Sequence, residues 1–323
     1  MDNSEYCLIW VKIKHSTFMR RINMFKPFGL IPALPTPMNE DNSIDYKGLE
    51  QIIEHLIDGG MHCLLVGGST GEYSLMSMEE RKEVIKFVCE TSKGRVPVMA
   101  GTGCHRTEDT IALTQYAAEV GADCALVINP YYMTTSRQGI IDHFKAVAEN
   151  SSIGIVIYHY PDATGVELDP ELIHEISQID GIVGIKNTAD GQHTSKLIAL
   201  TKDNPNFAVL TGFEHLILPT LALGGHGAVG LVHNLAPKKL AKLYDLIVNE
   251  NNLKEATKLN QELLDLYNAI EEETIPGTLK AGLEALGLAG GPSRLPLVPA
   301  SDNFRLRIES VLTELGEIKV KQH

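Results

Sequence analysis

A lysine at the end of a short apolar run has the clearest chemical potential in this sequence. The segment Gly181–Thr188 reads GIVGIKNT, and its β-branched residues predict a buried parallel strand that ends at Lys186. Burial disfavours the charged form of an amine, so a lysine at the mouth of such a strand can act as a nucleophile near neutral pH. The alternative is an ordinary strand-end lysine whose stem covers apolar surface while its ammonium reaches water.

Hydroxyl groups and glycines follow other predicted strands. Tyr158 and the segment Asn129–Tyr132 place phenols at strand ends, where a phenol can transfer protons. The loop Gly67–Glu72, GGSTGE, combines backbone amides with the hydroxyls of Ser69 and Thr70, a combination that suits a carboxylate or a phosphate. Each feature alone also fits a wall tyrosine or a tight turn. Together with the lysine they are the parts of a lyase that forms a Schiff base with a 2-oxo acid.

Other catalytic chemistries lack their sequence motifs. No GxSxG nucleophile elbow is present, and Gly101–Cys104 lacks the third glycine and acidic partner of a dinucleotide site. The candidate metal ligands show neither HxH nor HExxH spacing: His159, Glu214, His215 and His226. We therefore predict no metal and no separate cofactor, only a covalent imine on Lys186.

The elements that must position these residues alternate along the chain. Eight strand–helix units of roughly thirty residues predict an α/β fold, a closed (β/α)8 TIM barrel, with a doubly wound open sheet as the alternative. The predicted strands are 29–34, 62–66, 96–100, 124–128, 153–158, 182–186, 208–211 and 227–232. The predicted helices are 46–57, 77–89, 107–120, 137–148, 170–177, 193–200, 216–223 and 237–248. In such a barrel the active site lies at the C-terminal ends of the strands.

The two ends of the chain depart from this alternation. After the eighth unit, helices are predicted at 253–270, 276–286 and 303–315, so we expect a barrel over 24–249 and a C-terminal helical domain over 250–323. At the other end, Cys7–Val11 is too short for a signal-peptide core, and basic residues follow it rather than precede it. We expect residues 1–23 to be a flexible or mis-assigned leader before Met24.

Composition narrows the class of protein further. The 323 residues are 44% hydrophobic and 21% charged, which is ordinary for a globular protein. The net charge of −13 argues against a nucleic-acid partner, because phosphate binding needs a basic patch. Five cysteines without CxxC spacing favour reduced thiols in a cytoplasmic protein. No apolar run approaches the length of a membrane span, so we expect no membrane association.

In order and spacing, five motifs resemble those of the pyruvate-dependent class I aldolases of the dihydrodipicolinate synthase / N-acetylneuraminate lyase superfamily. The motifs are GGSTGE at 67–72, NPYY at 129–132, YHYPDATG at 158–165, GIKNT at 184–188 and GGHGAVG at 224–230. The resemblance extends from about Phe28 to the C-terminus. It implies a TIM barrel with a helical C-terminal domain, and a homotetramer assembled as a dimer of dimers.

The resemblance also implies roles for individual residues. Lys186 would form the Schiff base with the C2 ketone of pyruvate or a 2-oxo acid, and Tyr158 would act as its general acid and base. Ser69 and Tyr132 would complete the proton relay, with Tyr132 reaching into the neighbouring subunit's site. The substrate-binding residues implied in this way are Thr70, for the carboxylate, and Val229, Gly68, Thr188 and Glu214.

Departures from the family pattern concern the second substrate. Dihydrodipicolinate synthases have an arginine in their YNxPxRTG segment where this chain has Ala163, which counts against aspartate semialdehyde. The asparagine of that segment is replaced by His159, so the family pattern does not predict the geometry of the pocket at this position. Thr211–Glu214, TGFE, resembles the Gly-Tyr-Asp of sugar-acid aldolases. By contrast, the tail segments IPG at 275–277 and GPSRLP at 291–296 resemble synthases and 4-hydroxy-2-oxoglutarate aldolases.

We therefore predict a pyruvate lyase that cleaves or forms a 2-keto-3-deoxy sugar acid or a 4-hydroxy-2-oxoglutarate-type acid, with pyruvate and an aldehyde as the small-molecule partners. The alternative is 4-hydroxy-tetrahydrodipicolinate synthase, which condenses pyruvate with aspartate semialdehyde. A catalytically silent barrel that binds a 2-oxo acid is a third hypothesis. It is disfavoured because binding alone needs no lysine–tyrosine relay.

Overall fold

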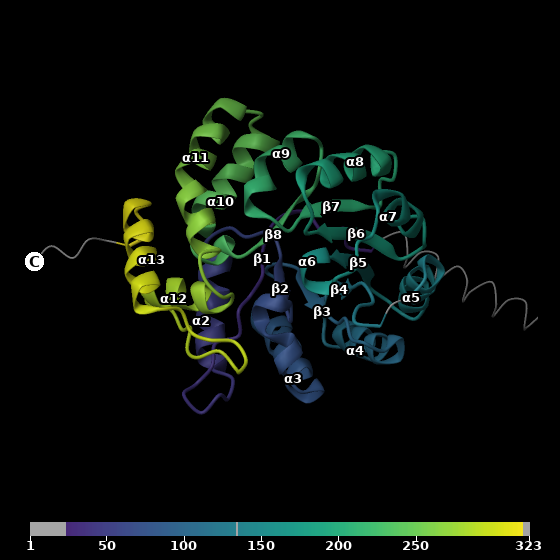
Figure 1. The fold of residues 1–323 in the computed structure, drawn as a ribbon, viewed down its shortest axis with the longest axis horizontal. Coiled ribbons are helices and arrows are strands. Elements are labelled where there is room, and N and C mark those ends of the chain that lie inside the picture. Colours follow the sequence, from purple (N-terminus) through teal and green to yellow (C-terminus); the bar gives the residue numbers. More distant parts are fainter. Residues whose placement is uncertain (1–23, 134, 319–323) are drawn as a thin grey trace, which may run out of the picture.

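Eight parallel strands form the centre of the computed structural model, which describes residues 24–133 and 135–318 (Figure 1). The hydrogen-bonded order is β1-β8-β7-β6-β5-β4-β3-β2, and a parallel bridge between Ala33 and Leu65 joins β1 to β2. The predicted TIM barrel is thereby confirmed. The predicted leader, residues 1–23, lies outside the described residues. The strands are β1 (Gly29–Pro32), β2 (Leu64–Val66), β3 (Val98–Gly101), β4 (Cys124–Ile128), β5 (Gly154–His159), β6 (Ile182–Asn187), β7 (Ala208–Thr211) and β8 (Gly227–Gly230).

Helices follow the strands and surround the barrel. Side-chain caps begin several of them: Ser77 and Glu80 form the predicted capping box at α3, and Asp190 accepts a hydrogen bond from His193 N at α8. The helices are α2 (Tyr46–Asp58), α3 (Met78–Ser92), α4 (Thr107–Glu119), α5 (Arg137–Glu149), α6 (Pro161–Thr164), α7 (Pro170–Ile176), α8 (Gly191–Thr201), α9 (Ile217–Ala222), α10 (Pro237–Tyr244), α11 (Leu253–Ile270), α12 (Gly277–Ala285) and α13 (Asp302–Glu314).

Three differences from the predicted elements involve hydrogen bonding or short helical turns at element ends. The predicted strand 227–232 ends at Gly230, because the N–H groups of Leu231 and Val232 donate to the Glu214 carboxylate instead of to a neighbouring strand. The predicted helix 237–248 is α-helical only to Tyr244 and continues as a π turn, η5 (Asp245–Asn249). Helix α6 was not predicted, because its four residues are too few to show a helical period.

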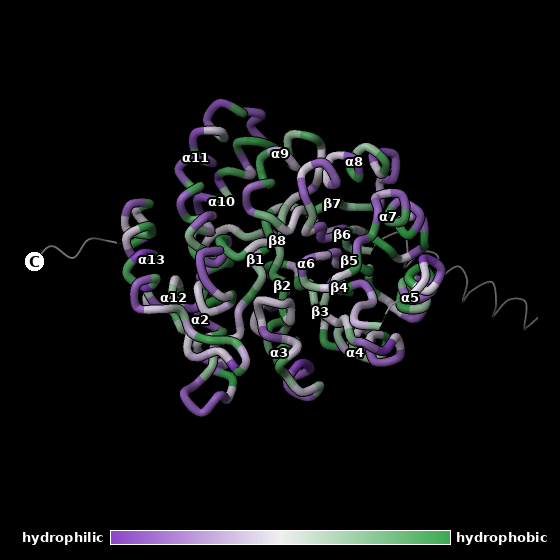
Figure 2. The backbone as a smooth tube through the Cα atoms, viewed as in Figure 1, coloured by the Kyte–Doolittle hydropathy of each residue, from purple (hydrophilic) through white to green (hydrophobic). Residues whose placement is uncertain are grey.

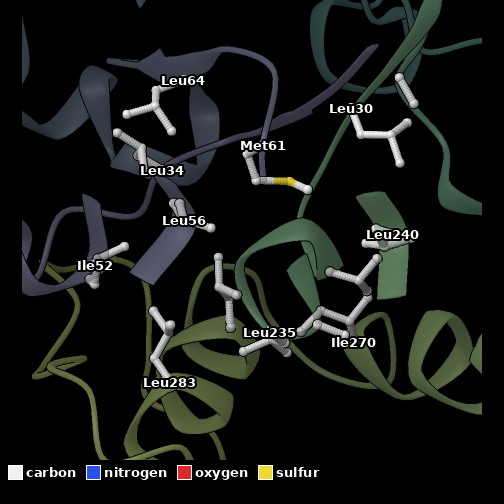
Figure 3. Packing of buried hydrophobic residues seen from close by; sticks show 14 of the residues in the cluster. Leu30, Leu34, Ile52, Leu56, Met61, Leu64, Leu235, Leu240, Ile270 and Leu283 are labelled. Carbon is white, nitrogen blue, oxygen red and sulfur yellow. The ribbon is translucent and has the colours of Figure 1, made fainter. Parts of the chain in front are cut away.

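The tail helices share a hydrophobic core with the barrel. One cluster of buried residues joins Leu30 of β1 and Leu56 of α2 to Leu235, Ile270 of α11 and Leu283 of α12 (Figure 3). Hydropathy alternates along the outer helices, whereas the strands are mainly hydrophobic (Figure 2). The predicted boundary near residue 250 stays a prediction, since buried side chains on both of its sides pack together. Within the described residues, no helix is both long enough and apolar enough to cross a membrane.

Candidate active site

Adjacent strand ends bring Lys186 and Tyr158 together. Tyr158 of β5 and Lys186 of β6 are register partners, and both side chains are buried, Lys186 with 7% of its surface exposed. The Lys186 Nζ atom lies 4.4 Å from the centroid of the Tyr158 ring. The Tyr160 ring stacks on Tyr158 with centroids 6.0 Å apart. A buried amine therefore stands beside a phenol, the pairing that imine chemistry needs.

A cavity of about 220 Å³ opens at these strand ends. Most of the predicted site residues line it: Lys186, Tyr158, Ser69, Thr70, Thr188, Glu214 and Val229. They come from the ends of β2, β5, β6, β7 and β8, which is the edge where barrel enzymes carry their chemistry. The volume suits a small molecule of a few carbon atoms rather than a polymer.

The turn after β2 presents Ser69 and Thr70 to this cavity. It is a single 3-10 turn, η1 (Ser69–Gly71), that follows Gly67, whose φ of +71° favours glycine. The Glu72 N–H donates to Ser69 O at 3.0 Å, and the Thr36 hydroxyl donates to Gly71 O at 2.9 Å. Both hydroxyls are thus held on a turn with fixed ends, as a carboxylate-binding cradle requires.

Close packing at the end of β7 leaves one hydroxyl free to meet a ligand. A Cβ atom at Gly212 would lie 2.0 Å from Thr188 Oγ1 and 3.2 Å from Lys186 Cε, so this approach requires glycine. Thr188 Oγ1 is buried and has no hydrogen-bond partner among the described residues. Because buried hydroxyls are usually paired, it is suited to an oxygen of a bound substrate.

Two carboxylates form another part of the cavity wall. Glu214 is buried and accepts hydrogen bonds from Leu231 N at 2.5 Å and Val232 N at 3.3 Å. Burial raises the pKa of the Glu214 carboxyl, and these N–H donors oppose the rise. Glu271, at the end of α11, is the second carboxylate. Among the described residues that line the cavity, Lys186 is the one with a basic side chain.

Two predicted site residues lie away from this cavity. Gly68 instead lines a neighbouring void of about 10 Å³ together with Arg81 and Tyr158. Tyr132 lies at the surface with 86% of the residue exposed and a φ of +68°. Its implied role in a neighbouring subunit's site therefore stays a prediction.

Several lining residues were not predicted. They include Tyr160, Phe213, Glu271 and Ile275. Strand alternation could have indicated Tyr160, because residues two apart face the same side of a strand. Glu271 and Ile275 come from the C-terminal helices, and no local motif marks them as site residues.

A hydrogen-bond network on the outer side of β5 and β6 holds the two strand ends together. His159 Nε2 accepts from Leu168 N at 3.1 Å, so its Nδ1 carries the proton and donates to Asn187 Oδ1 at 2.8 Å. Asn187 Nδ2 donates in turn to Thr194 Oγ1 at 3.0 Å. Burial lowers the pKa of His159, which fits this neutral form. His159 therefore packs in the wall and does not line the cavity.

Metal-ligand geometry is not found at the strand ends. Over residues 24–133 and 135–318, no three His, Cys, Asp or Glu side chains are grouped so that they could hold an ion.

Comparison with known proteins agrees with this geometry. The model of the Dihydrodipicolinate synthetase family matches residues 26–315. A 4-hydroxy-tetrahydrodipicolinate synthase of Methanothrix thermoacetophila is 42% identical over 292 residues, 90% of this chain and 97% of that protein. One from Archaeoglobus fulgidus is 36% identical over 288 residues, 89% and 98% of the two chains.

Solved structures agree in fold. The dihydrodipicolinate synthase from Aquifex aeolicus has a TM-score of 0.85 and 34% identity, covering 90% of this chain and 98% of that one. YagE, a prophage protein of E. coli K12 described in complex with pyruvate, has a TM-score of 0.86 and 31% identity, covering 90% and 99%.

Proposed function

The chain belongs to the dihydrodipicolinate synthetase family of pyruvate-dependent carbon–carbon lyases, and from this premise we propose that Lys186 forms an imine with the C2 carbon of pyruvate. The observation that carries the proposal is the pairing of a buried lysine with a tyrosine at adjacent strand ends, inside a cavity that also presents two hydroxyls on a fixed turn. A binding protein would have no use for the amine–phenol pair.

In the proposed reaction the uncharged Lys186 amine adds to the ketone carbon, and loss of water from the carbinolamine gives the imine. The Tyr158 phenol delivers the proton that the leaving water needs and takes it back later. Thr70 holds the carboxylate, and we propose that Ser69, which the resemblance places in the proton relay, holds it as well. This contact fixes the ketone against the amine. The Tyr158 phenolate left by the loss of water accepts a C3 proton, which gives an enamine. The enamine carbon attacks the aldehyde carbon, the Tyr158 phenol protonates the aldehyde oxygen, and hydrolysis of the product imine frees Lys186. Cleavage of a 4-hydroxy-2-oxo acid is the same sequence in reverse.

For the aldehyde, the relatives favour the second of the two enzymes predicted from the sequence. The curated relatives named above are 4-hydroxy-tetrahydrodipicolinate synthases, at 36–42% identity over about nine-tenths of this chain. We therefore propose condensation of pyruvate with aspartate semialdehyde as the first activity to test. The second activity to test is that of a sugar-acid or 4-hydroxy-2-oxoglutarate aldolase, which was the first prediction from the sequence.

A specific feature of the cavity keeps the aldolase in consideration. Glu214 and Glu271 would repel the carboxylate of aspartate semialdehyde, whereas they could accept hydrogen bonds from the hydroxyls of a neutral aldehyde. Ala163, where synthases have arginine, lies exposed in α6 and offers no charge. These side chains favour an aldehyde without a carboxylate. This fits a sugar-acid aldolase, but not a 4-hydroxy-2-oxoglutarate aldolase, whose aldehyde is the carboxylated glyoxylate.

The two candidates are separated by comparing aldehydes at saturating pyruvate. We expect a synthase to give the higher kcat/KM with aspartate semialdehyde, and an aldolase with glyceraldehyde or glycolaldehyde. Ala163→Arg should raise kcat/KM for aspartate semialdehyde by about tenfold, since a charge-assisted hydrogen bond contributes about 1.5–3 kcal/mol. Ala163→Gln is the uncharged control. No gain from the arginine would mean that other wall residues set the specificity.

A further inference from the structure

A buried ion pair connects the turn after β2 to the C-terminal helices. Lys280 of α12 donates through Nζ to Glu72 Oε1 at 2.6 Å, and the exposed side-chain fractions of the two residues are 2% and 0%. The same ammonium donates to Pro292 O at 2.7 Å. Glu72 directly follows the turn that carries Ser69 and Thr70, and 208 positions separate it from Lys280.

Glu72 has an unfavourable backbone conformation that these contacts hold. Its φ of 60° and ψ of 30° lie in the left-handed region, which is rare for a residue with a side chain as long as glutamate. Its other carboxylate oxygen, Oε2, accepts from the backbone N–H of Arg294 at 2.9 Å. Both oxygens of Glu72 are therefore held by the C-terminal region, and these contacts keep the residue in its unfavourable backbone conformation.

The backbone of Glu72 connects these contacts to the turn that lines the cavity. Its N–H donates to Ser69 O and closes the 3-10 turn. Arg294 reinforces the segment, because its guanidinium donates to Leu75 O at 3.1 Å and to the Glu80 carboxylate. A shift of Glu72 would thus move the hydroxyls of Ser69 and Thr70 relative to Lys186.

Attachment of the C-terminal helices does not need this pair. The large apolar cluster that contains Ile270 and Leu283 already joins them to the barrel. A buried ion pair is often no more stabilising than apolar residues of similar volume, because both charges lose their hydration. Its place beside the turn therefore indicates a positioning role more than a role in stability.

We propose that Lys280 is a positioning residue for the 2-oxo acid, which acts through Glu72 to hold the Ser69–Gly71 turn at the distance from Lys186 that the substrate carboxylate requires. The kinetic part of the inference, an effect on pyruvate binding, rests on the proposed imine chemistry. The structural part, that Lys280 holds the Ser69–Gly71 turn, does not. It predicts that losing Lys280 weakens pyruvate binding and spares the chemical step.

The test compares wild type, Lys280→Met, the double variant Glu72→Gln/Lys280→Met, and Lys196→Met. Lys196 is the matched control, because its Nζ lies 2.6 Å from Glu171 but both side chains are more than half exposed. We expect Lys280→Met to raise the KM for pyruvate at least tenfold with kcat within threefold of wild type, as expected when ground-state and transition-state binding are lost equally. Lys196→Met should match wild type in both constants.

The double variant separates positioning from the cost of an unpaired buried charge. Glu72→Gln removes the charge that Lys280→Met would strand, so the melting temperature should recover toward wild type while the KM stays raised. A folded double variant with the wild-type KM would overturn the inference. So would a KM increase of the same size in Lys196→Met. If Lys280→Met fails to fold, the double variant carries the test.

Hydrogen exchange distinguishes failure of this inference from failure of the proposed function. Peptides that cover residues 67–76 should exchange faster in both Lys280 variants than in wild type, with or without pyruvate. Unchanged exchange would overturn the inference even if wild type forms the imine. If wild type forms no imine with pyruvate, the proposed function fails, and the exchange result alone decides whether Lys280 holds the turn.

Discussion

The two sides of the cavity are held by different kinds of contact. On the side of Lys186 and Tyr158, neutral hydrogen bonds join elements of the barrel itself: His159 donates to Asn187 between β5 and β6, and Asn187 donates to Thr194 of α8. On the side of the β2 turn, a buried ion pair reaches in from the C-terminal helices. Neutral partners add no charge beside the Lys186 amine, so they do not shift its pKa. The hydroxyls on the turn do not need to titrate, so a charged pair can lie next to them. We infer that the first side serves the chemical step and the second serves binding.

The largest effect should come from removing the phenol on the chemical side. Tyr158→Phe keeps the ring against Lys186 but loses the proton donor, so we expect kcat to fall by about 10²- to 10⁴-fold with little change in melting temperature. Steady-state kinetics with pyruvate and the preferred aldehyde measure this. Tyr46→Phe, whose hydroxyl contacts Glu83 on the surface, is the control. A near-normal kcat in Tyr158→Phe would exclude the assigned role.

A smaller effect, opposite in kind to that of Lys280→Met, should follow from breaking the neutral network. Asn187→Leu would leave the buried His159 Nδ1–H without its partner and loosen the register of β5 and β6. We expect about 1–3 kcal/mol of destabilisation. We also expect kcat to fall roughly tenfold while the KM for pyruvate changes little.

The outcome of that experiment sharpens or breaks the comparison between the two sides. Asn39→Leu, at an exposed asparagine that donates to Ser43, serves as the control. A raised KM with normal kcat in Asn187→Leu would show that the two sides do not divide binding from chemistry.

The smallest effect should be a pH-dependent loss of stability on the binding side. The hydrogen bonds from Arg294 hold the pKa of Glu80 at about 2, below its ordinary 4.5. Because the folded-state pKa is the lower one, the contribution is present above pH 4.5 and is lost as pH falls toward 2. After allowance for partial exposure, Glu80→Gln should cost about 1 kcal/mol at pH 7 and roughly half of that or less at pH 3.

Melting temperatures of wild type and Glu80→Gln across this pH range measure the difference. A gap that is equally large at pH 7 and pH 3 would argue that the carboxylate charge contributes nothing to this contact.

Much of the fold and the chemical side could be predicted, because both depend on local sequence. Apolar runs mark the strands, and a barrel places strand ends such as Tyr158 and Lys186 at one edge. The binding side could be predicted only in part. Ser69 and Thr70 belong to a recognisable glycine-rich loop, but Glu271 and Lys280 meet the loop region through tertiary contacts that no periodicity records.

Tertiary context also explains where β8 ends and why Tyr132 does not line the cavity of its own chain. The end of β8 depends on the Glu214 carboxylate, which takes the next two backbone N–H groups. Tyr132 follows a strand end, yet its positive φ turns the chain outward and leaves the side chain exposed. A strand-end position therefore makes a residue a candidate for the site without ensuring that it lines the cavity.

The most direct test of the central claim is borohydride reduction in the presence of pyruvate, followed by intact-mass measurement and peptide mapping. Reduction converts an imine to a stable secondary amine, which adds the pyruvate skeleton to the modified lysine. We expect one adduct per chain, located on Lys186 and absent from Lys186→Ala. No adduct, or an adduct on a different lysine, would contradict the account.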